Sequence, residues 1–264
     1  MLTTNPFSEL AVSISPGAMQ TYVVVMILLV IGGTIFDVIH KKSAQYFFNN
    51  MQRAKSKGTK VLSGGQKASI AIKTVAEDVL TSGEFCNPKR RIAHLLTMYG
   101  LVLFVLATAV MVFSYPTAAT PSPVIWPLLW HLGALMVCVG GYWFWFFIRV
   151  DVAAEGYSPF RLIKADLFVL SLIATTTFAL IWSIFQFAGA DVLATLFFVL
   201  FIVSATVLFG GVPWSKFAHM FFKPAAAFEK RLSEADGSRN NLPPPVDAPA
   251  KYGIGIKREL PRHY

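Results

Sequence analysis

Five long apolar runs limit what this chain can fold into more than any other feature. They cover residues 22–39, 92–114, 125–148, 165–187 and 192–211. A helix needs roughly 20 apolar residues to cross the hydrocarbon layer of a bilayer. In lipid, helices satisfy their own backbone hydrogen bonds, so an apolar run of this length folds as a helix. We therefore predict an all-α, multi-pass integral membrane bundle of five transmembrane helices.

The composition supports this class and excludes several functions. Hydrophobic residues make up 55% of the chain and charged residues 14%, whereas about 25% is charged in soluble domains. The two cysteines, Cys86 and Cys138, are too few for an iron–sulfur cluster, which normally needs four thiolates. Walker, dinucleotide-binding, zinc-protease and nucleophile-elbow motifs are absent. We predict no catalytic residue and no metal site, and at most the membrane subunit of an oxidoreductase complex.

The basic residues indicate an orientation. Residues 40–91 hold 11 lysines and arginines, residues 149–164 hold three and residues 212–264 hold nine, which together are all 23. Cytoplasmic loops of membrane proteins are enriched in these residues. We expect a periplasmic segment 1–21, a cytoplasmic carboxyl terminus and a location in the bacterial inner membrane. The high pI then reflects topology and anionic lipids rather than a nucleic-acid partner.

Two segments predicted to be cytoplasmic carry amphipathic patterns. Residues 40–91 form an insert within the transmembrane domain 22–211, and Ile72, Val75, Val79 and Leu80 fall on one helical stripe there. Such a helix either lies on the membrane surface or receives a soluble partner. Residues 212–264 begin with a second amphipathic helix, which we expect Pro224 to interrupt. A proline-rich linker follows, and the terminal "KYGIGIKRELPRHY" either docks onto a partner or is disordered.

The histidines are candidates for a haem site. A b-type haem in a helical bundle needs two imidazoles at similar depth on facing helices. His94 lies just inside the second apolar run, His40 at the inner end of the first, and His219 eight residues beyond the fifth. One candidate haem b site therefore combines His94 with His219 or His40.

Two other interpretations of these polar residues stay open. Ionisable groups within membrane segments are functional candidates because burying them is costly. Hydrogen bonding to a quinone, or a proton relay, is a second role for Arg91, Tyr99, Asp37, His131 and the histidines above. The third interpretation is that the histidines face lipid headgroups and water. For Asp37 and Asp166, near the inner boundary, we expect ion pairs with nearby cations.

Aromatic residues and glycines predict how the helices sit. Trp126 and Trp130 at the outer edge of the third run are typical of an interfacial belt, and less so of an electron-transfer chain. The glycine pairs at 32–33, 140–141 and 210–211 indicate close helix contacts.

Three stretches carry a resemblance to a known family. They are "FCNPKRRIAHLLTMYG", "LGALMVCVGGYWFWFFIRVDVAAEG" and "PWSKFAHMFFKP". With the five spans, they resemble the membrane protein associated with adenylylsulfate reductase in sulfur-oxidising bacteria. The pattern is more distantly similar to the membrane subunit of the quinone-interacting oxidoreductase complex. It is also similar to the five-helix cytochrome b subunits of respiratory nitrate reductase and heterodisulfide reductase.

The resemblance implies a function. This chain would anchor cytoplasmic adenylylsulfate reductase, which forms adenylylsulfate from sulfite and AMP, and would pass electrons to the quinone pool. In the nitrate reductase subunits, two histidines on the second helix and two on the fifth hold two haems. His94 matches one of the former and His219 lies beyond the fifth run, while the other two are missing, which excludes a two-haem wire of that construction. The alternatives are a scaffold without redox activity and a single-haem cytochrome b subunit for another partner.

Overall fold

The computed structural model describes residues 1–40, 43–56, 58–83, 85, 87–149, 160–215, 217, 219–238, 251–252 and 256–257. The chain divides into two compact units. The first comprises residues 1–37 and 92–218, and the second comprises residues 38–91 and 219–264. The amphipathic insert and the carboxyl-terminal segment, far apart in sequence, therefore share one unit. The sequence pattern did not indicate this.

Five helices are long and apolar enough to cross a membrane, as a multi-pass membrane protein requires. They are α2 (Pro16–His40), α5 (Pro88–Ser114), α6 with its π-helical end η2 (Ile125–Trp143, Phe144–Ile148), α8 (Leu167–Phe187) and α9 (Asp191–Gly210). The all-α prediction is confirmed, and so is the presence, among the described residues, of five helices that could span a membrane. Short elements complete the first unit: α1 (Pro6–Leu10), η3 (Lys164–Asp166) and η4 (Val212–Trp214).

Two helices begin earlier than their apolar runs because of capping residues. The Ser15 hydroxyl accepts a hydrogen bond from the Ala18 amide, and Pro16 opens α2. The Asn87 side chain accepts from the Lys89 amide at 3.0 Å, and Pro88 opens α5. A short polar residue followed by proline suits a helix start, because proline there loses no needed N–H.

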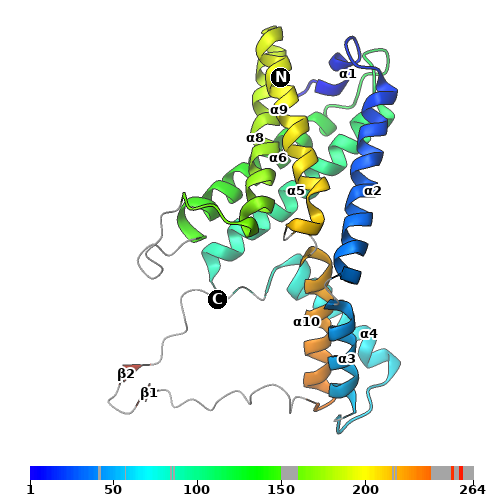
Figure 1. Cartoon of the computed structure of the whole chain (residues 1–264), viewed down its shortest axis with the longest axis vertical. Coiled ribbons are helices and arrows are strands. Elements are labelled where there is room, and N and C mark those ends of the chain that lie inside the picture. The colour runs from blue at the N-terminus through cyan, green and yellow to red at the C-terminus, as the bar shows by residue number, and fades with distance from the viewer. Residues whose placement is uncertain are drawn as a thin grey trace. The chain divides into compact units, whose positions relative to one another are not determined.

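The helices of the first unit pack closely at small residues. A Cβ added to Gly133 would lie 2.7 Å from the Gly100 carbonyl oxygen, and one added to Gly140 would lie 2.7 Å from the Ala93 carbonyl oxygen. Thus α5 and α6 touch backbone to backbone at two levels. Close approach was predicted for the pairs at 32–33, 140–141 and 210–211. It is confirmed at Gly140 and wrong at Gly32, where an added Cβ would meet nothing within 4 Å, whereas the pair Gly100 and Gly133 was not predicted. Helices α8 and α9 run antiparallel through a turn in which Gly189 has φ +69° (Figure 1).

The core of this unit is aromatic. Trp130 stacks on Phe104 with ring centroids 5.2 Å apart, and Trp182 stacks on Phe201 at 5.7 Å. Phe7 from α1 meets both tryptophans edge-on. The prediction of an interfacial position is wrong for Trp130, which is fully buried and donates from Nε1 to the Thr108 hydroxyl. Its polar group therefore needs no headgroup or water partner.

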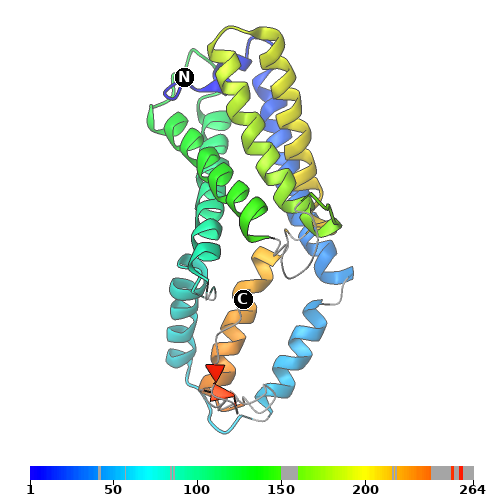
Figure 2. The same ribbon diagram turned by 90° about the vertical axis from the view of Figure 1, so that its left-hand side faces the viewer.

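The second unit is built from three helical segments: α3 (Ser43–Lys55), α4 continued by the π-helical η1 (Gly64–Lys73, Thr74–Leu80), and α10 (His219–Ala235). Both α3 and α4–η1 contact α10 (Figures 1 and 2). Ser63 caps α4 in a reciprocal capping box with Gln66. The predicted interruption at Pro224 is wrong. This proline lies in the second turn of a helix that continues through it, so only one N–H bond near the helix start is lost.

The tail is described in part. Two-residue strands β1 (Lys251–Tyr252) and β2 (Ile256–Lys257) pair antiparallel. The predicted linker and most of the terminal docking segment, at residues 239–250, 253–255 and 258–264, lie outside the described residues.

Candidate functional site

The first unit buries a histidine with both ring nitrogens engaged. His131 on α6 and Ser183 on α8 are each 4% exposed, and His131 Nε2 lies 2.8 Å from Ser183 Oγ. His131 Nδ1 lies 2.7 Å from the Pro127 carbonyl oxygen. A carbonyl can only accept, so Nδ1 carries a hydrogen. In the neutral imidazole, Nε2 then accepts from the Ser183 hydroxyl.

Polar groups continue from this pair toward α1. Gln186 lies three residues after Ser183 and so on the same side of α8. Its Nε2 donates to the Pro6 carbonyl at 2.9 Å and to the Glu9 carboxylate at 3.0 Å. A cavity of about 10 Å³ is lined by Glu9, Ser183 and Gln186, among others. Sequence reasoning singled out His131 but not Ser183 or Gln186, although two polar residues three apart in an apolar helix were a visible signal.

The two histidines of the first unit, His94 and His131, were not predicted to share a haem, and they lie at different levels of the bundle. His94 is half-buried near the start of α5, close to the level where Ala93 meets Gly140. The level of His131 follows from its neighbour Trp130, which bonds Thr108 on α5. Thr108 lies more than ten residues after His94 along α5. At 1.5 Å per residue this is roughly 15 Å or more. These two histidines therefore do not fit one haem, and both nitrogens of His131 already have partners.

The remaining predicted site residues are divided between the two units. His40 and His219 belong to the second unit, as does Arg91, whose Nε donates to the Thr81 carbonyl at 2.6 Å. Asp37, buried in the last turns of α2, and Tyr99, exposed on α5, belong to the first. The haem set His94 with His219 or His40, and the quinone set Arg91, Tyr99, Asp37 and His131, stay predictions.

An ion pair predicted for Asp166 is confirmed. Arg149, which follows η2, donates from Nε to the Asp166 carboxylate at 2.8 Å and forms a second contact through a terminal nitrogen. The guanidinium carbon lies 4.1 Å above the Trp145 ring centroid. Both charged side chains are 10% exposed. This paired geometry indicates a structural contact that joins the ends of α6 and α8.

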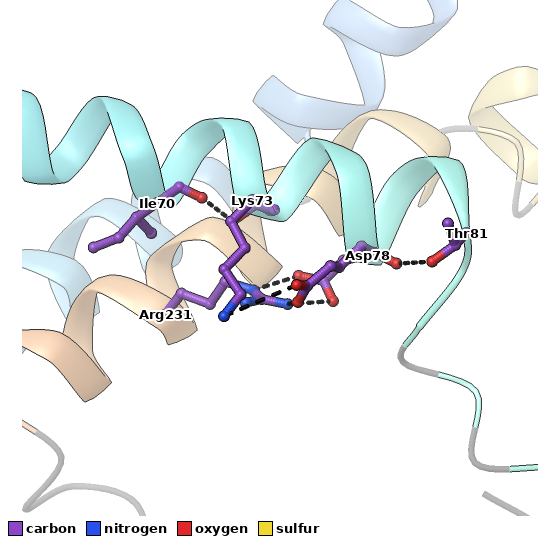
Figure 3. Close-up of polar contacts among 7 residues, drawn as sticks. Ile70, Lys73, Asp78, Thr81 and Arg231 are labelled. Atoms are coloured by element: carbon purple, nitrogen blue, oxygen red, sulfur yellow. Dashed lines mark hydrogen bonds and ion pairs between the residues drawn. The ribbon is translucent and has the colours of Figure 1, made fainter.

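The second unit holds α10 against η1 through charge. Arg231 donates from Nε to Asp78 at 2.6 Å and from a terminal nitrogen to Glu77 at 2.8 Å (Figure 3). The hydrogen bonds that it donates to Asp78, and then to Glu77, raise the pKa of the Arg231 guanidinium above its ordinary value. The guanidinium therefore stays charged at every pH at which the protein is handled.

The predicted apolar stripe of α4–η1 faces away from this contact. Ile72 is 71% exposed and Val75 is 50% exposed, whereas Thr74, on the other side of the helix, is buried. The helix thus packs on α10 with polar residues and presents its apolar residues outward. An exposed apolar stripe on an amphipathic helix marks an interaction surface, for which the membrane surface and a soluble partner both stay open.

A hydrocarbon-lined cleft of about 200 Å³ opens in the first unit. Its walls come from Tyr22 on α2, Val112 on α5 and Phe198 on α9, and Phe7 closes it near α1. The Tyr22 hydroxyl bonds the Ile202 carbonyl and the Thr206 hydroxyl. Because that polar group is already occupied, the cleft suits an apolar chain rather than a polar ring.

Among the residues described, no group of three or more histidine, cysteine or acidic side chains is arranged to hold a metal ion. Searches of protein-family models, curated proteins and solved structures found no match to this chain.

Proposed function

We propose that this chain anchors a soluble redox enzyme, adenylylsulfate reductase by the resemblance of its sequence, to the bacterial inner membrane and links it to the quinone pool. The observation that carries the proposal is the exposed stripe of Ile72 and Val75 in a strongly basic unit. The second unit contains 19 of the 23 lysines and arginines, against eight of the 14 acidic residues.

The occupant that fits this surface is a protein with an apolar groove rimmed by carboxylates. An amphipathic helix docks into such a groove through residues spaced three and four apart, and Ile72, Val75 and Val79 have that spacing. Complementary charge steers the encounter and fixes its orientation. The apolar cleft of the first unit supports the quinone part of the proposal, because an isoprenoid tail is a hydrocarbon chain.

In this proposal, the electrons released by one half-reaction are taken up by the other. Sulfite and AMP give adenylylsulfate and two electrons, and the quinone takes two electrons and two protons to become quinol. The protein supplies the dock and the quinone tail site. A scaffold that only localises the enzyme is the second candidate, because the exposed stripe of Ile72 and Val75 would account for docking without any redox site.

The first experiment tests docking. Ile72→Glu with Val75→Glu is expected to abolish co-purification of adenylylsulfate reductase, because charges on the stripe would be buried in the groove. The matched control is Val61→Glu, a fully exposed apolar residue of the same unit outside the helix, which should leave co-purification unchanged. Equal retention of the enzyme by both variants would refute the docking surface.

The second experiment separates electron transfer from scaffolding. Membranes that hold both proteins should reduce quinone when supplied with sulfite and AMP, and deletion of this chain should remove that activity. The same rate from added soluble reductase without this chain would refute the electron-transfer role. A reduced-minus-oxidised spectrum with a haem b band lost in His94→Ala would establish the single-haem cytochrome instead.

A third measurement tests orientation. In a chain with Cys86 and Cys138 replaced, a cysteine at Thr117 should react with an impermeant maleimide in intact cells. A cysteine at Ser63 should react only after the membrane is opened. The opposite pattern would place the basic unit outside and end the proposal of a cytoplasmic partner.

A further inference from the structure

The buried histidine of the first unit is linked to the surface by a nearly complete line of polar groups. Glu9 is exposed, and its carboxylate accepts from Gln186. Ser183 Oγ contacts His131 Nε2. Among the described residues, no hydrogen bond joins Gln186 to Ser183, and both side chains line the cavity of about 10 Å³.

Three properties of the cavity point to a water molecule. Its volume matches the roughly 10–15 Å³ that one water needs. Gln186 Oε1 is buried and has no hydrogen-bond partner among the described residues. Ser183 Oγ donates to His131 and can still accept from a water, and Glu9 supplies a second acceptor. A water here would therefore have the two to four polar partners that buried waters make.

We propose that this cavity binds one water and that Glu9, the water and Ser183 form a route by which His131 exchanges its proton with the surface at α1. A proton on Glu9 passes to the water, a proton of the water passes to Ser183 Oγ, and the Ser183 proton passes to His131 Nε2. The net change is a neutral carboxyl becoming a carboxylate and a neutral imidazole becoming an imidazolium. No other reactant is required.

The groups around His131 show which side chains the proposed proton route connects. Glu9 is the ionisable side chain that lines the cavity, and Met1 also lines it. The imidazole meets the Trp130 ring edge-on, with centroids 4.9 Å apart, and is otherwise held by Pro127 and Ser183. His131 is thus a proton-accepting group inside an apolar bundle. The inference holds whether or not the proposed function is right, because it concerns proton exchange alone.

The test is nuclear magnetic resonance of the full chain in lipid nanodiscs, with ¹⁵N-labelled histidine. The His131 resonance is assigned by its loss in His131→Gln. In the unsubstituted chain, its ring nitrogens should exchange with solvent deuterium and respond to bulk pH. Ser183→Ala and Gln186→Met should each slow this exchange by about tenfold or more, since each removes a member of the hydrogen-bonded line.

The matched control is Ser204→Ala. Ser204 is a buried serine on α9 whose hydroxyl, among the residues that the structure describes, bonds only the Leu200 and Phe201 carbonyls of its own helix. Exchange at the unsubstituted rate in both Ser183→Ala and Gln186→Met would overturn the route, as would equal slowing in Ser204→Ala. A high-resolution density map should show a water within hydrogen-bonding distance of Ser183 Oγ and Gln186 Oε1. A map that shows side chains clearly but no water there would also overturn it.

Discussion

The contact between α5 and α6 at Gly100 and Gly133 allows a quantitative prediction. In Gly133→Ala, the new Cβ would lie 2.7 Å from the Gly100 carbonyl oxygen and 2.7 Å from the Phe104 amide nitrogen. Both neighbours are backbone atoms, so neither can move aside by changing rotamer. The helices must separate, and overpacking of this kind costs about 1–3 kcal/mol.

The control has the opposite sign. A Cβ added to Gly32 on α2 meets nothing within 4 Å. Replacing a glycine in a helix interior by alanine gains about 0.5–1 kcal/mol, because glycine loses more backbone freedom on folding. We therefore expect Gly133→Ala to lower the free energy of unfolding and Gly32→Ala to leave it unchanged or raise it.

The assay is thermal unfolding in detergent at a fixed scan rate, and the midpoint is monitored by the near-ultraviolet circular dichroism of the buried tryptophans. For a chain of this size, about 1 kcal/mol shifts the midpoint by roughly 2–4 °C, so Gly133→Ala should lower it by about 2–12 °C. The double variant with Gly100→Ala should fall by less than the sum of the two single variants, because either substitution already separates the helices. Equal midpoints for Gly133→Ala and Gly32→Ala would refute the close contact.

Three further predictions concern the charged contacts. Arg231→Gln should speed amide hydrogen exchange in α10 and lower the free energy of unfolding by up to about 1 kcal/mol. The neighbouring, exposed Lys230→Gln should change neither quantity. Equal exchange in the two variants would contradict the role of Arg231. Because hydrogen bonds to Asp78 and Glu77 raise the pKa of Arg231 above its ordinary value, its stabilising contribution is present in full between pH 7 and 10. Exchange of the α10 amides, corrected for intrinsic rates, should therefore not change over that range. A loss of protection there would contradict this expectation. Arg149→Met should lower the thermal midpoint by an amount equivalent to about 3 kcal/mol, because it leaves the buried Asp166 carboxylate without its cation. A midpoint within a degree of that of the unsubstituted chain would show that the pair is not structural.

The sequence alone determined where the five long apolar helices lie. The run expected at 192–211 is α9 (Asp191–Gly210), and the run expected at 125–148 ends where η2 ends. Such agreement is possible because the length and hydropathy of a run are local properties, and lipid leaves a long apolar run almost no fold but a helix. The earlier starts of α2 and α5 were also readable, from serine or asparagine before proline.

Only the tertiary structure decided which faces meet. Trp130 has the residue type and position of a belt aromatic, yet it is fully buried, because α8 and α1 cover it. Which side of α4–η1 is exposed depends on the ion pair between Arg231 and Asp78, which are 153 residues apart in sequence. The water-sized cavity that Ser183 lines likewise depends on the contact of Gln186 with α1. Packing choices of this kind depend on contacts between distant segments, and neither periodicity nor composition encodes them.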